Sequence, residues 1–75
     1  MIYELVKKHI EINPEVRFGK PVIRGTRLTV EDILLMLAEG MSKEEIIEEY
    51  PQLDEEKIRA ALYFAAHKEK ILALI

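Results

Sequence analysis

The chain has 75 residues, of which 49% are hydrophobic and 33% are charged, a balance that is typical of folded soluble domains and excludes a disordered or membrane-embedded chain. This length is near the lower limit for a self-sufficient core, so we expect a single domain supported by a second copy or a partner. The longest apolar run, residues 33–38, is far shorter than the roughly 20 residues that span a bilayer.

Cysteine is absent, which excludes disulfides and thiolate metal sites. The opening stretch "MIYELVKKHIE" lacks the long apolar segment of a signal peptide, so we expect a cytoplasmic protein without membrane association. The net charge of −3 is unevenly distributed: residues 1–30 carry six Lys/Arg and three acids, whereas residues 31–75 carry five and eleven. Any nucleic acid should therefore contact the N-terminal segment, because the acidic remainder repels phosphate.

Residues 1–28 are predicted to form a short β arm. The stretch "HIEINPEVRFGKPVIRGTRLTV" alternates Ile10 with Ile12, and its prolines and glycines indicate turns between short strands. Such strands have no obvious sheet to complete within the chain, which would leave their edges unpaired. We therefore expect a homodimer in which the arms of two subunits pair.

Two short helices are predicted after the arm, over about residues 30–39 and 43–49. Each begins with a capping-box pattern, in which a Ser or Thr and an acidic residue three positions later satisfy free backbone N–H groups, and each ends at a residue that stops a helix. The capping pairs are Thr29 with Asp32 and Ser42 with Glu45, and the stops are Gly40 and Pro51.

A third helix is predicted to begin after Asp54 and to continue to about residue 72. Its expected core stripe consists of Ile58, Ala61, Leu62 and Ala65. Its opposite side carries residues at spacings of 4, 4 and 3, which aligns them along the helix: Arg59, Tyr63, His67 and Lys70.

The predicted fold is therefore mainly α: a single three-helix, homeodomain-like helix-turn-helix domain over residues 1–75 with a short N-terminal β arm. In such domains the third helix lies in the major groove of DNA, and basic arms contact phosphates. The candidate DNA-binding residues are Arg17, Lys20, Arg24, Arg27, Arg59, Tyr63 and His67.

Each part of this assignment has a structural alternative. The arm cations can equally form a solvated or partner-facing patch, and Tyr63 with Phe64 can form a dimer or partner surface. The acids at residues 54–56 oppose insertion of the third helix into DNA. The alternatives differ in one respect: cations that converge on one face favour DNA, whereas scattered cations favour a protein partner.

The sequence contains little catalytic chemistry. His9 and His67 lie far apart and have no carboxylate at zinc-protease spacing, and Ser42 is already explained as a helix cap. The glycines match neither a Walker-A nor a dinucleotide pattern. We expect no enzyme activity, no cofactor and no metal.

Residues 13–66 resemble the small prokaryotic domain-of-unknown-function family 433. The resemblance rests on four stretches in a fixed order, namely "GKPVIRGTR", "GMSKEEI", "YPQL" and "IRAALYFA". It implies a homeodomain-like or winged-helix-type fold with an N-terminal β element. It also implies an antitoxin of a Vap-type toxin–antitoxin pair, whose partner would be a PIN-like ribonuclease toxin. An acidic surface would suit the cationic RNA-binding cleft of such a toxin.

The combined prediction is an antitoxin-like, DNA-binding transcriptional regulator that binds its own promoter and neutralises a PIN-like ribonuclease toxin. The alternative is a protein-interaction module with a helix-turn-helix shape and no DNA binding.

Overall fold

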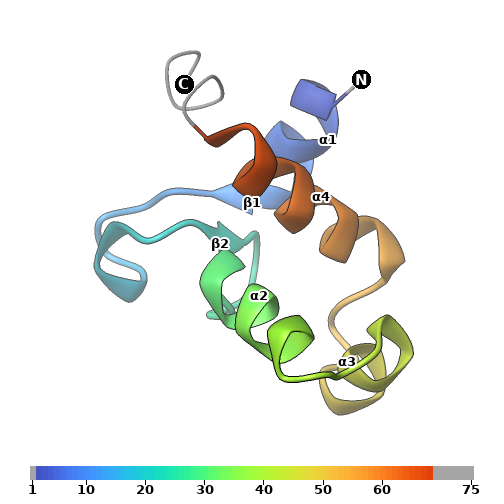
Figure 1. Ribbon diagram of the computed structural model, residues 1–75. Helices are drawn as coiled ribbons and strands as arrows, with labels where there is room; N and C mark the ends of the chain where they lie inside the picture. Colours follow the sequence, from blue (N-terminus) through green and yellow to red (C-terminus); the bar gives the residue numbers. More distant parts are fainter. Residues whose placement is uncertain (1, 69–75) are drawn as a thin grey trace.

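The computed structural model describes residues 2–68, which form four α-helices and a two-stranded sheet (Figure 1). The elements are α1 (Ile2–His9), β1 (Ile10–Glu11), β2 (Val22–Ile23), α2 (Val30–Ala38), α3 (Lys43–Glu49) and α4 (Glu55–Ala66), with a 3-10 turn at Arg17–Gly19. Within this part of the chain, no helix has the length and apolarity needed to cross a bilayer. Lys70 and the predicted end of the third helix near residue 72 lie outside the described residues.

The first helix corrects the prediction that all of residues 1–28 form a β arm. Residues 2–9 are helical, with Glu4 near the positive end of the helix dipole and Lys7 and Lys8 near its negative end. Val6 is buried, and α1 packs against α4. The strand signals that motivated the arm begin only at residue 10.

The two strands pair with each other in the same chain. β1 and β2 are antiparallel, with Ile10 opposite Ile23 and Glu11 opposite Val22. Ile10, Val22 and Ile23 are buried, so the strands belong to the core. The expectation that the strands have no sheet to complete within the chain was therefore wrong, whereas the homodimer through the arm stays a prediction.

The predicted starts and stops of α2 and α3 are confirmed. Both capping boxes are complete: the Thr29 hydroxyl accepts from the Asp32 backbone N–H at 2.8 Å, and the Ser42 hydroxyl accepts from the Glu45 backbone N–H at 3.1 Å. Gly40 stops α2 with a φ of +100°, which a residue with a side chain rarely adopts.

The predicted start of α4 is also confirmed, but its buried face differs from the prediction. Asp54 accepts a hydrogen bond from the Lys57 backbone N–H at 2.8 Å. The helix ends at Ala66 because His67 leaves helical geometry, and the ring Nδ1 of His67 donates to the Tyr63 carbonyl at 3.2 Å.

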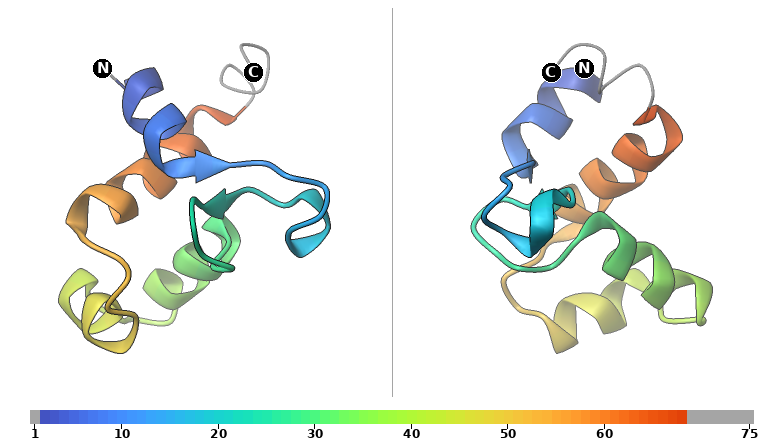
Figure 2. Two further views of the ribbon diagram at one scale, coloured as in Figure 1. Left: turned by 180° about the vertical axis from the view of Figure 1, so that it is seen from behind. Right: turned by 90° about the vertical axis from the view of Figure 1, so that its left-hand side faces the viewer.

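The core stripe of α4 is rotated from the expected one. Leu62, predicted to be buried, is 39% exposed, whereas Phe64, considered for a partner surface, is buried. The reason is that α4 runs through the middle of the molecule, with α1 on one side and α2 and α3 on the other (Figure 2). Ala60 and Ala61 are buried as well, since small side chains let these neighbours approach.

The mainly α class is thus confirmed. The finer homeodomain-like assignment remains a prediction, because α1 adds a fourth helix to the three that were expected.

Candidate functional site

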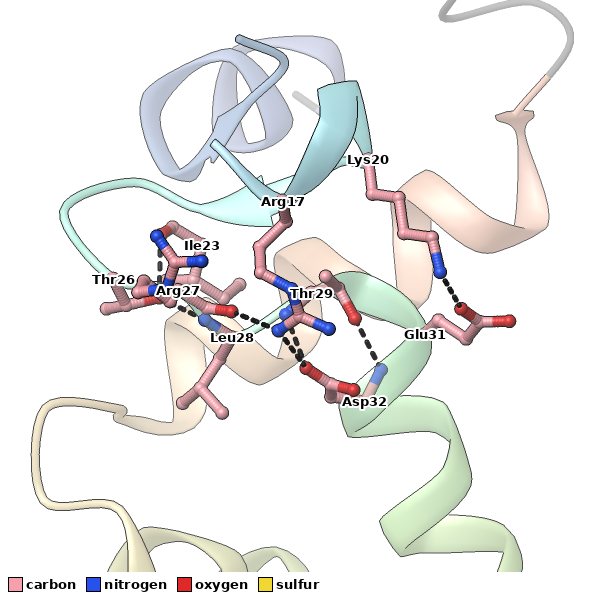
Figure 3. A network of polar contacts seen from close by, with 9 residues as sticks. All are labelled: Arg17, Lys20, Ile23, Thr26, Arg27, Leu28, Thr29, Glu31 and Asp32. Carbon is pink, nitrogen blue, oxygen red and sulfur yellow. Dashed lines mark hydrogen bonds and ion pairs between the residues drawn. The ribbon is translucent and has the colours of Figure 1, made fainter. Parts of the chain in front are cut away.

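Two of the predicted arm cations are bound to the first turn of α2 (Figure 3). Arg17 donates through Nη1 to the Arg27 carbonyl at 2.8 Å and to the Asp32 carboxylate at 3.3 Å. Lys20 pairs with Glu31, with 3.2 Å between Nζ and Oε1. Both cations therefore tie the loop between the strands to α2, and their charges are opposed by carboxylates of the same chain.

Arg24 is held at a different place, over the end of α1. Its guanidinium group donates to the carbonyls of Lys7, Lys8 and Ile10 at 2.9, 3.2 and 3.1 Å. Its backbone N–H donates to the His9 carbonyl at 2.7 Å. Because the last carbonyls of a helix have no intrahelical partner, Arg24 acts as a cap supplied by the segment that follows β2.

Arg27 differs from the other three cations. Its backbone carbonyl accepts from Arg17, but its exposed guanidinium group has no hydrogen bond or ion pair within residues 2–68. It is therefore the candidate of this group that is available to an external anion without breaking an internal contact.

Of the three remaining candidates, Arg59 and Tyr63 lie four residues apart on α4, whereas His67 is the C-cap outside helical geometry, and each has a local contact. Arg59 pairs with Glu55 at 3.3 Å, and Glu55 also lies 3.7 Å from Lys43 of α3. Tyr63 is half-buried against the core, and His67 caps the helix. Six of the seven candidates thus have contacts at three separate places, namely the start of α2, the end of α1 and α4 with its C-cap, whereas the Arg27 guanidinium has none within residues 2–68.

Three carboxyl groups have lowered pKa values because of such contacts. Burial alone would raise the pKa of Asp32, but hydrogen bonds from Thr29 and the Arg17 guanidinium outweigh it and hold that pKa below the ordinary value. The backbone and side-chain hydrogen bonds of Lys57 lower the pKa of Asp54. Hydrogen bonds from His9 and Lys8 lower the pKa of Glu56.

The pair of His9 and Glu56 is a structural contact between helices. The ring Nε2 of the buried His9 lies 2.5 Å from the Glu56 carboxylate, which links α1 to α4. Within the described residues, no group of three His, Asp or Glu side chains is arranged to hold a metal ion.

The glutamates of α3 contrast with the paired cations. Glu44, Glu48 and Glu49, here called the acidic face, are exposed and have no side-chain partner within residues 2–68. Glu48 and Glu49 lie in the last turn of α3, where the negative end of the helix dipole disfavours an acid. Their placement therefore does not serve the stability of the helix.

Sequence reasoning missed Phe18. Its side chain is 96% exposed at the tip of the loop between β1 and β2. Arg17, Phe18 and Gly19 have φ values of +49°, +60° and +82°, which is unfavourable for the two residues that have side chains. The available signal was an aromatic residue beside a glycine, in a loop that contains two prolines.

An open pocket of about 480 Å³ lies between α2 and α4. Its apolar lining is formed by Pro21, Val30, Leu34, Phe64 and Ala65. Charged residues also line it, namely Lys20, Glu31 and Lys68.

Residues 10–65, which run from β1 into the last turn of α4, match the model of a family described as "Protein of unknown function (DUF433)". The chain belongs to the DUF433 family. This confirms the resemblance inferred from "GKPVIRGTR" and the stretches that follow it. The DUF433 match contains the Phe18 loop, the pocket except for Lys68, and the acidic face, whereas α1 precedes it.

Two DUF433-related proteins illustrate the match. The crystal structure of a DUF433 member protein from Anabaena variabilis ATCC 29413 has a TM-score of 0.76 and 30% sequence identity, over 93% of this chain and 70% of that one. The uncharacterized protein y4eO of Sinorhizobium fredii (strain NBRC 101917 / NGR234) is 45% identical over 53 residues, or 71% of this chain. The aligned region spans about a quarter of y4eO, 24% of its length.

Proposed function

We propose that this DUF433 chain is a non-catalytic, antitoxin-like binding module whose acidic face on α3 binds a cationic surface of a partner protein, such as a PIN-like ribonuclease toxin. The observation that carries the proposal is the contrast in pairing. The glutamates of the acidic face have no side-chain partner in the described chain, whereas Arg17, Lys20, Arg24 and Arg59 are held by oxygens of the same chain.

The position of the acids supports a protein partner over DNA. In a helix-turn-helix domain the elements equivalent to α3 and the start of α4 approach the phosphates. Here α3 carries the acidic face, and α4 begins at Asp54, Glu55 and Glu56. Phosphates would be repelled by this surface, whereas a cationic protein surface would be attracted and its association accelerated.

The second candidate is a DNA-binding transcriptional regulator, a homodimer that binds its own promoter. The exposed guanidinium of Arg27, which has no hydrogen bond or ion pair within residues 2–68, favours it, together with the alignment of Arg59 and Tyr63 along α4. Binding several phosphates would require Arg17 and Lys20 to leave Asp32 and Glu31. That exchange reduces the gain from each contact, so we rank DNA binding second.

A paired experiment separates the two candidates. PIN-like ribonucleases from the same genome are titrated with the wild-type chain, with a Glu44→Gln, Glu48→Gln, Glu49→Gln variant and with Arg27→Gln, and RNA cleavage is measured. We expect the wild type and Arg27→Gln to inhibit one of these enzymes, and the triple variant to inhibit it at least 10-fold less, because the cationic surface has lost its counter-charges.

The same three proteins are tested by fluorescence anisotropy against the upstream duplex and a scrambled duplex at two salt concentrations. Sequence-preferring, salt-sensitive binding that Arg27→Gln weakens, without inhibition of any ribonuclease, would reject the first candidate in favour of the second.

A further inference from the structure

Phe18 is presented to solvent by a loop that is held rigidly in an unfavourable conformation. The backbone turns at Val16 to Lys20 are closed by hydrogen bonds from Gly19 to the Val16 carbonyl (3.1 Å) and from Lys20 to the Arg17 carbonyl (3.2 Å). Arg17 then fixes the loop to α2 through Asp32 and the Arg27 carbonyl (Figure 3). An aromatic ring fixed outward loses little conformational freedom on binding, which suits an anchor residue.

The charges around this ring disfavour nucleic acid as its partner. Proteins that stack aromatic residues on bases surround them with a positively charged groove. Beside Phe18, Arg17 is paired with Asp32, and Lys20 is paired with Glu31. An apolar cavity is therefore the better match for this side chain.

The pocket between α2 and α4 offers apolar lining, and Lys20, Glu31 and Lys68 border it as well. Its volume of about 480 Å³ is within the range of cavities that enclose small ligands, and it is lined by Leu34, Phe64 and Ala65. The chain's own Phe18 does not fill it, since that ring is almost fully exposed.

Lys20 connects the anchor residue Phe18 with the pocket, because it lies two residues after Phe18 in the sequence and lines the pocket. The loop that carries Phe18 projects from the helical body (Figure 1). A two-fold axis near Lys20 would bring each anchor to the pocket of a second copy, because a two-fold contact is reciprocal. Because one chain carries both the exposed aromatic residue and the pocket, a second copy of the chain can supply the occupant.

We propose that two copies of this chain form a reciprocal dimer in which Phe18 of each copy enters the α2–α4 pocket of the other. This contact replaces the arm-to-arm strand pairing that the sequence suggested. It does not depend on the proposed function, because it uses neither the acidic face nor Arg27.

The first test is sedimentation equilibrium of the wild type, Phe18→Ala and a matched control, Leu62→Ala, which truncates an exposed apolar residue of α4 outside the pocket lining. We expect a wild-type dimer whose dissociation constant rises at least about 30-fold in Phe18→Ala and stays within threefold in Leu62→Ala. Because Phe18 is 96% exposed, the variant should keep the wild-type unfolding curve. A wild type that stays monomeric at millimolar concentration, or a dimer that Phe18→Ala leaves intact, would overturn the proposal.

The second test uses the absence of native cysteine. Phe18→Cys is mixed with Ala65→Cys under mild oxidation, and Phe18→Cys is mixed with Leu62→Cys as the control. A cross-linked heterodimer in the first mixture alone is expected, since Ala65 lines the pocket and Leu62 does not. Equal cross-linking in both mixtures, or none in the first, would refute insertion into the pocket. So would a monomeric wild type whose Phe18→Ala variant loses inhibition of a ribonuclease, because the anchor would then serve another protein.

Discussion

In residues 17–27, three of four cations are held by carbonyl or carboxylate oxygens of their own chain, whereas in α3 three glutamates have no side-chain partner within the described residues. The two regions lie within one small domain and carry charges of opposite sign. An exposed ion pair contributes little to stability, but it does cancel the field of the cation for an incoming anion. The acidic face keeps its field. The charge that a partner meets therefore depends on pairing in the fold and cannot be counted from the sequence.

The contrast between paired cations and unpaired glutamates would not hold if Arg24 were free to bind a ligand. We expect Arg24→Ala to lower the free energy of unfolding by about 2 kcal/mol, because two carbonyls in the last turn of α1 and the Ile10 carbonyl of β1 lose a charged donor. Urea unfolding followed by circular dichroism measures the loss.

Arg27→Ala is the matched control and should stay within about 0.5 kcal/mol of the wild type, since its exposed guanidinium makes no hydrogen bond or ion pair within residues 2–68. Equal stability of the two variants would show that the contacts of Arg24 with α1 contribute nothing. Arg24 would then be as available to a ligand as Arg27.

The dependence on Arg24 also explains why α1 was missed. An eight-residue helix is marginal by itself, and α1 is completed by a guanidinium 15 residues beyond its end and by burial of Val6 against the core. Neither contact is visible until β1 and β2 are paired. The capping boxes at Thr29 and Ser42, in contrast, involve residues three positions apart, and for that reason α2 and α3 were predicted to within about a residue.

The candidate site was predicted less well than the fold for the same reason. The sequence identifies Arg17 and Lys20 as cations, but Asp32 and Glu31, which oppose their charges, are 15 and 11 residues away. Phe18 was overlooked because exposure of an aromatic residue depends on the conformation of its loop. The family assignment succeeded, since it rests on the order of residues alone.

We expect a smaller loss of folding stability at low pH. This loss tests the carboxyl groups that are paired within the chain. The pKa values of Asp32, Asp54 and Glu56 are lowered in the folded chain, so their ionised forms stabilise it above the unfolded pKa of about 4. That contribution is lost as the pH falls through the lower, folded pKa values. Urea unfolding at several pH values between 7 and 2.5 should therefore show decreasing stability below about pH 4.

Asp32→Asn identifies the part of this dependence that comes from the loop contact. It removes the charge beside Arg17 and weakens the Thr29 capping box, which should cost about 1 kcal/mol at pH 7 and make the decrease in acid shallower. Glu44→Gln is the matched control, because Glu44 is exposed and unpaired, and it should leave the acid dependence unchanged. Identical pH profiles for wild type and Asp32→Asn would contradict the pairing with Arg17.

The smallest change in stability is expected where the acids are unpaired. Replacing Glu44, Glu48 and Glu49 with Gln should raise the free energy of unfolding by a few tenths of a kcal/mol, because it removes mutual repulsion and two acids at the negative end of the α3 dipole. Added salt should stabilise the wild type more than this variant, since screening relieves the same repulsion. If the triple variant is instead destabilised by 1 kcal/mol or more, the glutamates serve the fold. A variant that is slightly more stable yet fails to inhibit a ribonuclease would show that these residues lower stability and are needed for binding.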